Sequence, residues 1–313
     1  MDKQTLISKP ITIIILNYNG ADDTIECVHS LQRNLHNIDL LEIVVLDNAS
    51  TDDSYIKISS TIGNAVTLIK NEGNAGYAAG NNIGIQYALT RGDGYICILN
   101  NDTIAVSDFL TPCIKALQDN PKAIITTPAI IDYKTGNYQN TGGKVSLIRA
   151  KTVFYNVEVS HDSNLPKQIE CDTVQGSVMV FRSSTIDMLG LIPEYYFMYF
   201  EETEWCYRAK LKGYHCLSLT DVSILHKGWA SMDGRSQVAQ YIYERNRVVF
   251  AKQFLNPYMF LLFLAIDFFR SIFRSLLNKE PIWKYVKWHW DGVKNHINKE
   301  LFSIPGAVWK NEF

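Results

Sequence analysis

The first hundred residues alternate between short apolar runs and longer segments with helical spacing, and this alternation constrains the fold most. Residues 11–16 are a nearly continuous β-branched run, which is typical of a strand buried on both faces of a parallel sheet. Further strands are predicted at residues 42–46, 66–70 and 95–99. Helices are predicted between them, at residues 22–35 and 75–89. This βαβα succession predicts an α/β fold with a mainly parallel, doubly wound sheet flanked by helices.

The middle of the chain is less regular. Loops around short strands are expected at 130–166, because this stretch is rich in Gly, Asn, Thr and Lys. A strand is predicted at 174–182, and a helix at Glu201–Leu211, which Gly213 would end. From Gln237 onward the pattern is helical, so we expect a helical C-terminal extension after the α/β region.

The composition is that of an ordinary folded protein, because 47% of the 313 residues are hydrophobic and 20% are charged. The net charge of −2 gives no indication of nucleic-acid binding. The six cysteines form no CxxC pair and no zinc spacing, so we expect buried thiols in a reducing, cytoplasmic compartment. We expect no secretory signal, and the longest apolar run has nine residues, whereas a membrane-spanning helix needs about 20.

The C-terminal stretch 251–313 is basic and aromatic, with nine Lys and Arg against five Asp and Glu, and four of the six tryptophans. Polar residues recur there with helical spacing, at Asp267, Arg270, Ser271, Arg274, Ser275 and Asn278. An apolar stripe beside lysines 284, 287 and 294 consists of Trp283, Val286, Trp290, Val293 and Ile297. Because amphipathic helices with Trp and Lys commonly lie in a bilayer interface, we predict peripheral membrane contact. The alternative is packing on the chain's own domain or on a partner subunit.

Polar residues directly follow three of the predicted strands. Asn17 follows the first, Asp47 and Asn48 follow the second, and Asn100-Asn101-Asp102 follows the fourth. Because ligands bind beyond the carboxyl ends of strands in doubly wound sheets, this pattern indicates a site. Asp102 suits a Mg²⁺ or Mn²⁺ ion that carries a diphosphate, and Asp47 could hydrogen-bond a nucleobase or ribose. The alternatives are ordinary turns and a helix-capping Asp.

Three further groups could contact a ligand. The segment NEGNAGYAAGNN opens a predicted helix with spaced glycines, where the backbone can approach a ligand closely; its residues of interest are Asn74, Gly76, Gly80 and Asn81. His226 follows an apolar strand and could complete a metal site with Asp102, although a lone His is more often structural. Arg245 and Arg247 could neutralise phosphate; without other context they would be surface cations.

An acidic cluster of Glu201, Glu202 and Glu204 opens the helix predicted at Glu201–Leu211. Like charges so close raise the pKa of at least one carboxyl group, which suits a general base. Glu204 can pair with Arg208 one turn later, whereas Glu202 has no evident cationic partner and is left free to act on a substrate. The alternative is a solvated acidic first turn that the helix dipole favours.

Taken together and in this order, these segments resemble the family 2 glycosyltransferases of the GT-A fold, especially the bacterial rhamnosyltransferase-like branch. The matching segments are TIIILNYNG, VVLDNASTDDS, NEGNAGYAAGNN, ILNNDT, VQGSVMVFR, FMYFEETEWCYRAKLKGY, ILHKGW and YERNRVVF. They span residues 12 to 250. Each motif is modest alone, but eight in the family's order are hard to obtain by chance.

The resemblance implies inverting transfer of a sugar from a UDP- or dTDP-sugar to a saccharide or polyprenyl-linked acceptor, with Mg²⁺ or Mn²⁺. Asp102 would hold the metal with His226; it ends the family's DxD motif, whose first Asp is Asn100 here. Glu202 would be the base, at a position where the family usually has Asp. The substrate-binding positions would be Asn17, Asp47, Asn48, Asn74, Gly76, Asn81, Asn101, Gly176, Glu201, Arg245 and Arg247.

We therefore expect a catalytic domain at 1–250 and an amphipathic helical region at 251–313, acting at the inner face of the cell membrane in polysaccharide or glycan synthesis. Two other functions stay open. A sugar nucleotidyltransferase would share the sheet and the metal, but it normally has a glycine-rich phosphate loop ending in a basic residue, which NYNGADD lacks. A catalytically degenerate, sugar-binding relative would bind nucleotide sugars without turnover.

Overall fold

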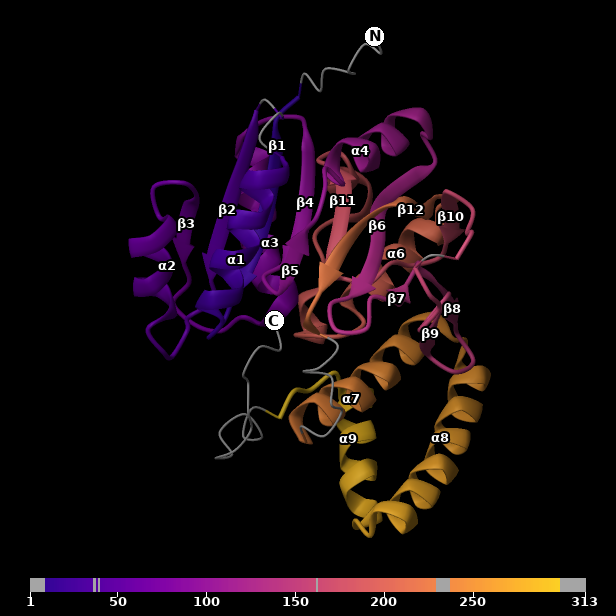
Figure 1. The fold of residues 1–313 in the computed structure, drawn as a ribbon. Helices are drawn as coiled ribbons and strands as arrows, with labels where there is room; N and C mark the ends of the chain where they lie inside the picture. Colours follow the sequence, from indigo (N-terminus) through magenta and orange to yellow (C-terminus); the bar gives the residue numbers. More distant parts are fainter. Residues whose placement is uncertain (1–8, 36–37, 39, 162, 229–236, 299–313) are drawn as a thin grey trace.

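The computed structural model of the chain describes residues 9–35, 38, 40–161, 163–228 and 237–298 (Figure 1). Residues 1–8, Trp229 of the ILHKGW segment and residues 299–313 of the predicted C-terminal region lie outside this range.

A ten-stranded sheet forms the centre of the structure. Its parallel part contains β4 (Tyr95–Asn100), β1 (Ile11–Asn17), β2 (Leu41–Asp47) and β3 (Thr67–Lys70), adjacent in this order. The connecting helices are α1 (Ala21–Asn34), α2 (Ser54–Ile62) and α3 (Gly76–Thr90). The strands and helices predicted for the first hundred residues are confirmed, and only α2 was not foreseen.

Strand β1 is buried on both faces, as its apolar run predicts. Ile13 and Ile15 point to the side of the sheet that α1, α2 and α4 (Leu110–Asp119) cover. Ile14 and Leu16 point to the opposite side, where α3 and α6 (Glu201–Leu211) pack. The period of two along the strand therefore divides the apolar side chains between two layers of helices.

The second half of the sheet is mixed. It contains β11 (Val178–Arg182), β6 (Ala123–Asp132), β12 (His215–His226) and β10 (Gln168–Cys171), with β5 (Thr103–Ala105) on β12 and β7 (Tyr138–Asn140) on β6. β11 runs antiparallel to both β4 and β6, because the chain returns to the sheet from its other end after a long excursion. That excursion includes the hairpin β8 (Gly143–Ser146) and β9 (Lys151–Phe154). The helical segments α5 (Thr185–Leu189) and η1 (Glu194–Tyr196) follow β11.

Three helices close the described chain: α7 (Gln237–Phe254), α8 (Pro257–Asn278) and α9 (Ile282–Lys294). In Figure 1 they lie below the sheet, on the side at which β1 and β12 end. Asn256 caps α8, since its side chain accepts from the Met259 N–H at 3.0 Å. The domain boundary predicted at residue 250 falls within α7.

The polar face of α8 points into the protein rather than toward water. Asp267 and Ser271 are buried, whereas Phe269 and Leu276 are 69% and 72% exposed. α8 packs against α7 and α9 through this polar face, so its apolar face is left outside. Within the described ranges, no helix has the length and hydropathy needed to cross a membrane.

Candidate active site

A buried polar network joins the carboxyl ends of β1 and β2. Asn17 and Asp47 lie opposite each other in the sheet, and both are fully buried. Asn17 Nδ2 donates to Asp47 Oδ1 at 2.8 Å, and the Ser50 hydroxyl donates to the same oxygen at 2.6 Å. Asp47 Oδ2 accepts from the Ser50 backbone N–H at 3.1 Å. These bonds hold the carboxylate in one orientation at the edge of the sheet.

Asn48 connects the end of β2 to the loop that opens α3. Its Nδ2 donates to Asn74 Oδ1 at 3.1 Å and to the Gly76 carbonyl at 3.3 Å. Asn81, further along α3, is buried too, and its Nδ2 donates to the Tyr77 carbonyl at 2.9 Å. Within the described chain its Oδ1 has no hydrogen-bond partner. The structure thus brings Asn48, Asn74 and Gly76 together beside the Asn17–Asp47 pair.

Packing within the protein accounts for the two glycines that open α3. Gly76 has φ +83°, and a Cβ there would lie 2.5 Å from Phe197 Cδ2 and 2.6 Å from the Phe197 carbonyl oxygen. A Cβ on Gly80 would lie 2.6 Å from Leu16 Cδ1. The sequence predicted a close backbone approach to a ligand, whereas the atoms that these glycines approach belong to the protein.

Asp102 and His226 lie together, as predicted, at the ends of β4 and β12. Asp102 Oδ1 is 3.2 Å from His226 Nε2, and the two side chains are 8% and 6% exposed. Neither atom has a hydrogen-bond partner among the residues described. Asn101 donates to Thr24 Oγ1 at 3.1 Å, and Thr24 Oγ1 donates to Asn17 Oδ1 at 2.8 Å. This chain of bonds connects the end of β4 to the polar network of β1 and β2.

Gln139 fixes the orientation of the His226 ring. Its Oε1 lies 2.8 Å from His226 Nδ1, and its Nε2 donates to the His226 carbonyl at 3.1 Å. Because an amide oxygen only accepts, Nδ1 carries a proton, and in the neutral imidazole Nε2 then presents its lone pair. That lone pair would then face the oxygen of Asp102, and a cation between two such acceptors removes their repulsion. The pair therefore fits a divalent metal ion, with Gln139 as the orienting partner of the histidine.

Lys227 and Gly228, which follow β12, lie beside this pair. No role was predicted for either residue from the sequence. The Lys227 backbone N–H donates to the Asp102 carbonyl at 3.0 Å, and its ammonium lies 2.7 Å from Asp23 of α1. A Cβ on Gly228 would collide with Asp102 Oδ2 and lie 2.8 Å from His226 Nε2. Only a residue without a side chain fits here, so Gly228 keeps the space beside the two candidate ligands open.

The turn between η1 and α6 is strained. Phe197, Tyr199 and Phe200 have φ of 68°, 64° and 77°, a region that costs a non-glycine residue about 1–3 kcal/mol. Phe197, with ψ −54°, has the geometry of a rare and strained γ-turn. Strain of this kind is kept where the surroundings impose it, commonly at active sites. Here it lies immediately before Glu201.

Glu204 is tied to the protein. Its predicted pair with Arg208 is confirmed, with Glu204 Oε1 3.5 Å from Arg208 Nε. The Tyr195 and Tyr196 hydroxyls also donate to its carboxylate, at 2.5 Å and 2.6 Å. Two phenol groups and a guanidinium group surround this carboxylate. It therefore holds α6 against the residues before the strained turn.

Glu201 and Glu202 have no cationic partner in the described part of the chain. Glu201 is buried, and its Oε2 has no hydrogen-bond partner there. Glu202 is partly exposed, and its Oε1 accepts from the Thr203 hydroxyl at 3.2 Å. Burial raises the pKa of Glu201 well above its usual value, and the Glu202 carboxylate adds to that effect. Burial also raises the pKa of Glu202, although hydrogen bonds oppose the rise, so this pair suits proton transfer.

The surroundings of Glu202 connect it to the other elements of the site. A Cβ on Gly176 would lie 3.7 Å from Glu202 Cγ, and the Gly176 carbonyl accepts from the Tyr77 hydroxyl at 2.5 Å. The Tyr77 N–H in turn donates to the Phe197 carbonyl at 2.7 Å. The strained turn, the start of α3 and the loop before β11 therefore meet around this carboxylate.

Arg245 and Arg247 are not surface cations, so that interpretation of the sequence is wrong. Both are buried, because α7 lies between the strained turn and the other C-terminal helices. Arg245 Nη1 donates to the Tyr195 carbonyl at 2.6 Å, and Arg247 Nη1 lies 2.9 Å from both Glu244 Oε2 and Asp267 Oδ1. These contacts engage both guanidinium groups inside the protein.

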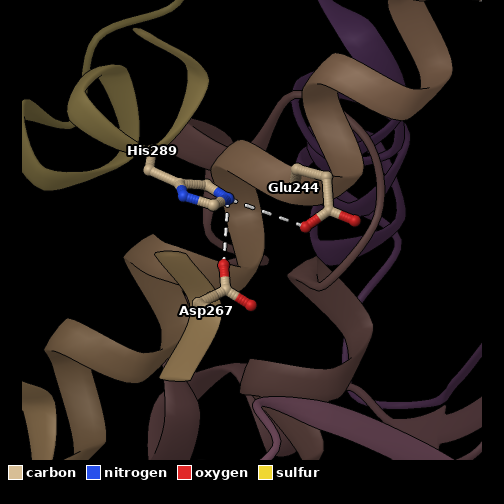
Figure 2. Close-up of side chains that lie close together, drawn as sticks. All are labelled: Glu244, Asp267 and His289. Carbon is tan, nitrogen blue, oxygen red and sulfur yellow. Dashed lines mark ion pairs between the residues drawn. The ribbon is translucent and has the colours of Figure 1, made fainter. Parts of the chain in front are cut away.

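A buried charge cluster joins α7, α8 and α9 (Figure 2). His289 Nε2 lies 2.9 Å from Asp267 Oδ2 and 3.9 Å from Glu244 Oε2, so three potential metal ligands meet here. Arg247 already contacts both carboxylates, and Arg270 Nη2 lies 2.6 Å from Glu244 Oε2. Because these arginines supply the positive charge, we interpret the cluster as an ion-pair network that holds the helices together.

The profile of glycosyl transferase family 2 matches residues 12–188, more than half of the sequence. The chain therefore belongs to glycosyl transferase family 2. It is a glycosyltransferase of the GT-A fold, as the resemblance predicted.

Two curated relatives and one solved structure extend this result. The low-salt glycan biosynthesis hexosyltransferase Agl10 of Haloferax volcanii is 26% identical over 234 residues, which cover 72% of this chain and 69% of that protein. The dTDP-rhamnosyl transferase RfbF of Shigella flexneri is 26% identical over 275 residues, 85% of this chain and 87% of that protein. The mannosyltransferase PcManGT of Pyrobaculum calidifontis, solved with GDP-Man and Mn²⁺, is 14% identical with a TM-score of 0.57, over 97% of this chain and 88% of that one. At that identity the structure supports the fold alone.

Proposed function

We propose that this chain is an inverting, metal-dependent glycosyltransferase that uses a UDP- or dTDP-sugar. The observation that carries this proposal is the pair of Asp102 Oδ1 and His226 Nε2, buried, 3.2 Å apart and otherwise without hydrogen bonds in the described chain. It lies at the ends of β4 and β12, and hydrogen bonds connect the end of β4 to the polar ends of β1 and β2.

The donor would lie across the carboxyl ends of the parallel strands. Asn17, Asp47 and Asn48 would line the nucleoside side, since their positions at the ends of β1 and β2 suit a ligand bound at the sheet edge. Asn74, Gly76, Asn81, Asn101, Gly176 and Glu201 are proposed as further substrate positions. We do not extend the proposal to Arg245 and Arg247, because carbonyl and carboxylate oxygens already engage their guanidinium groups.

Asp102 and His226 would hold Mg²⁺ or Mn²⁺, which would supply a positive charge for the diphosphate leaving group. Glu202 would take the proton from the acceptor hydroxyl as that oxygen bonds to the anomeric carbon. The carbon–oxygen bond to the diphosphate breaks, and its electron pair stays on the diphosphate oxygen. Attack opposite the leaving group inverts the anomeric centre in a single displacement.

The relatives indicate which substrates to try first. RfbF is named a dTDP-rhamnosyl transferase and Agl10 a hexosyltransferase of glycan synthesis. We therefore propose a saccharide or polyprenyl-linked acceptor, in cell-surface polysaccharide or glycan synthesis. A degenerate sugar-binding relative is the main alternative, and it would bind a nucleotide sugar without releasing the nucleoside diphosphate.

Replacing Asp102 with alanine should abolish metal-dependent donor binding and leave the fold intact. The parent should be stabilised by UDP or dTDP with Mn²⁺ in a thermal-shift assay, because a ligand that binds the folded state raises its stability by mass action. The variant should lose this stabilisation, since His226 alone is left to hold the ion. A screen of nucleotide sugars in the same assay would identify the donor.

Asp93→Ala is the matched control, because this exposed carboxylate lies at the other end of β4. It should respond to Mn²⁺ and nucleotide like the parent. If Asp102→Ala binds nucleoside diphosphate and Mn²⁺ as tightly as the parent, the metal assignment is wrong.

We also propose that the exposed faces of α8 and α9 contact an anionic membrane surface. The apolar side chains that face outward are Tyr258, Leu261, Leu262, Ile266, Phe268, Phe269, Phe273, Leu276, Leu277, Trp283, Val286 and Trp290. Lys287 and Lys294 are exposed among them, and Lys294 Nζ lies 5.0 Å from the centre of the Trp290 ring. Apolar and cationic side chains on one face match an interface of acyl chains and anionic headgroups. Such contact would place the enzyme at the cytoplasmic face of a membrane.

Leu276→Glu should weaken binding to phosphatidylcholine–phosphatidylglycerol vesicles by about tenfold or more, since burying one leucine contributes about 1.5–3 kcal/mol. Co-sedimentation measures this, with Leu211→Glu as the control, because Leu211 on α6 is 63% exposed and Leu276 is 72% exposed. Equal vesicle binding by parent and Leu276→Glu would refute the membrane proposal. If Leu276→Glu instead converts a dimer to a monomer, the face is an interface between copies.

A further inference from the structure

We propose that Asn246 is a positioning residue that holds the strained turn in front of Glu201 and so sets the place of Glu202. This inference rests on the proposed function, in which Glu202 is the base. Asn246 lies on α7, far from the acidic cluster in sequence, and the role is visible only from its contacts.

The side-chain amide of Asn246 bonds to the turn at three points. Its Nδ2 donates to the carbonyls of Tyr196 at 3.0 Å, Met198 at 2.7 Å and Tyr199 at 2.8 Å. The residue is fully buried, so water cannot replace these bonds. A turn with three positive-φ residues would relax without such partners, because Met198 and Tyr199 lie between η1 and α6 and their carbonyls belong to no regular element.

Arg245 fixes the orientation of that amide. Its Nη1 donates to Asn246 Oδ1 at 2.6 Å, which directs the Nδ2 group toward the turn. The same guanidinium donates to the Tyr195 carbonyl at 2.6 Å and to Asn295 Oδ1, after α9, at 2.5 Å. Two consecutive residues of α7 therefore bind four of the five backbone carbonyls from Tyr195 to Tyr199, and the bond to Asn295 supports them.

The anchored residues of the turn are followed almost at once by the acidic residues of α6. Phe200 is the last residue of the turn, and α6 begins at Glu201. On the other side, the Tyr77 N–H of α3 donates to the Phe197 carbonyl at 2.7 Å. Residues of α3 and α7 thus both hold the turn. If the hydrogen bonds from α7 were lost, a movement of the turn would displace the first residues of α6.

Asn246→Ala should lower kcat about 10–100-fold, since a misplacement near 1 Å can have that effect on a reacting group. The KM of the nucleotide sugar and the Kd of UDP or dTDP with Mn²⁺ should stay within about twofold, because no donor position contacts Asn246. Asn246→Asp should be at least as impaired, since it replaces the donor with an oxygen that faces three carbonyls. A calorimetric stoichiometry equal to the parent's would exclude a loss of folded protein.

The matched control is Val248→Ala, which shortens a buried side chain on the same helix and leaves the hydrogen bonds to the turn. It should lower stability without changing kcat per binding site. Chymotrypsin, which cleaves after aromatic residues, gives a readout that needs no turnover. It should cut within 195–200 faster in Asn246→Ala than in Val248→Ala at matched stability.

The two claims can fail separately. If the parent turns over donor, Glu202→Gln is inactive and Asn246→Ala is normal in kcat, the positioning role is overturned and the proposed base stands. If chymotrypsin cuts the turn equally in Asn246→Ala and Val248→Ala, the positioning role is overturned whatever the activity. If the turn opens in Asn246→Ala while Glu202→Gln keeps full activity, Asn246 holds the turn but Glu202 is not the base.

Discussion

Replacing Glu202 with glutamine is expected to lower the transfer rate by about 10²–10⁴-fold, the usual range for a removed acid–base group. Donor binding should be retained, because glutamine has nearly the same shape and the donor contacts lie on other elements. The structure supports this choice, since Glu202 is partly exposed and the side-chain hydrogen bond that its carboxylate accepts comes from the neighbouring Thr203. The rate of nucleoside diphosphate release, measured with saturating donor and acceptor, checks the prediction.

Glu204→Gln is the matched control on the same helix. Two tyrosine hydroxyls and Arg208 surround the Glu204 carboxylate, so this variant should lose more stability than turnover. If Glu202→Gln turns over normally while Glu201→Gln is inactive, the base is the buried Glu201.

Glu244→Gln is expected to lower the free energy of unfolding by about 3–5 kcal/mol, the range for breaking a buried ion pair by removing one partner. Glu244 is buried and contacts Arg247 at 2.9 Å, Arg270 at 2.6 Å and Arg274. A glutamine cannot neutralise the charge of the buried Arg247. Within the described chain, Asp267 would then be the carboxylate left to pair with Arg247. Urea denaturation followed by circular dichroism measures the loss.

The control for this variant is Asp22→Asn, which breaks the exposed pair with Lys57 at 2.6 Å. Exposed pairs contribute about 0–1 kcal/mol, so little change is expected. A Glu244→Gln protein within about 0.5 kcal/mol of the parent would contradict the ion-pair interpretation of the cluster.

The same cluster gives the stability a dependence on pH. Burial opposes the charge of Glu244, but contacts with His289 and the arginines outweigh it and hold its pKa below the usual range. Its stabilising effect is present above about pH 4.3, the unfolded value, and is lost as the pH falls through the folded pKa. Hydrogen bonds to Asp267 and Glu244 raise the pKa of His289 against the effect of burial. Its stabilising effect is therefore complete below about pH 6.5 and is lost as the pH rises through the folded pKa.

Hydrophobic periodicity predicted the strands and helices of the first hundred residues except α2, and the polar strand ends predicted that Asp102 and His226 lie together. These features are local, because an apolar run and the polar residue after it are adjacent in sequence. The antiparallel direction of β11 was not predictable, since it depends on how the excursion after β6 returns to the sheet. The buried state of Arg245 and Arg247 depends in the same way on helices that pack much later in the chain.

The hydrogen-bond and ion-pair partners of the predicted site residues were the hardest features to predict from the sequence. Gln139 lies in a short edge strand, and nothing local relates it to His226. The polar stripe of α8 was correctly recognised, but its partners were not predictable, because Asp267 finds them on α7 and α9, far away in sequence or in a separate helix. Only Gly228 left a local signal, a glycine two residues after the histidine that ends a strand.

The most direct test of the account is the release of nucleoside diphosphate from dTDP-rhamnose and a set of UDP-sugars. The parent and Glu202→Gln would each be assayed with Mn²⁺ and with EDTA, after donor binding has been measured for both. We expect at least one donor to be turned over by the parent with Mn²⁺ only, and bound but not turned over by Glu202→Gln. A parent that binds a donor with Mn²⁺ but never releases the diphosphate, or a Glu202→Gln variant as fast as the parent, would contradict it.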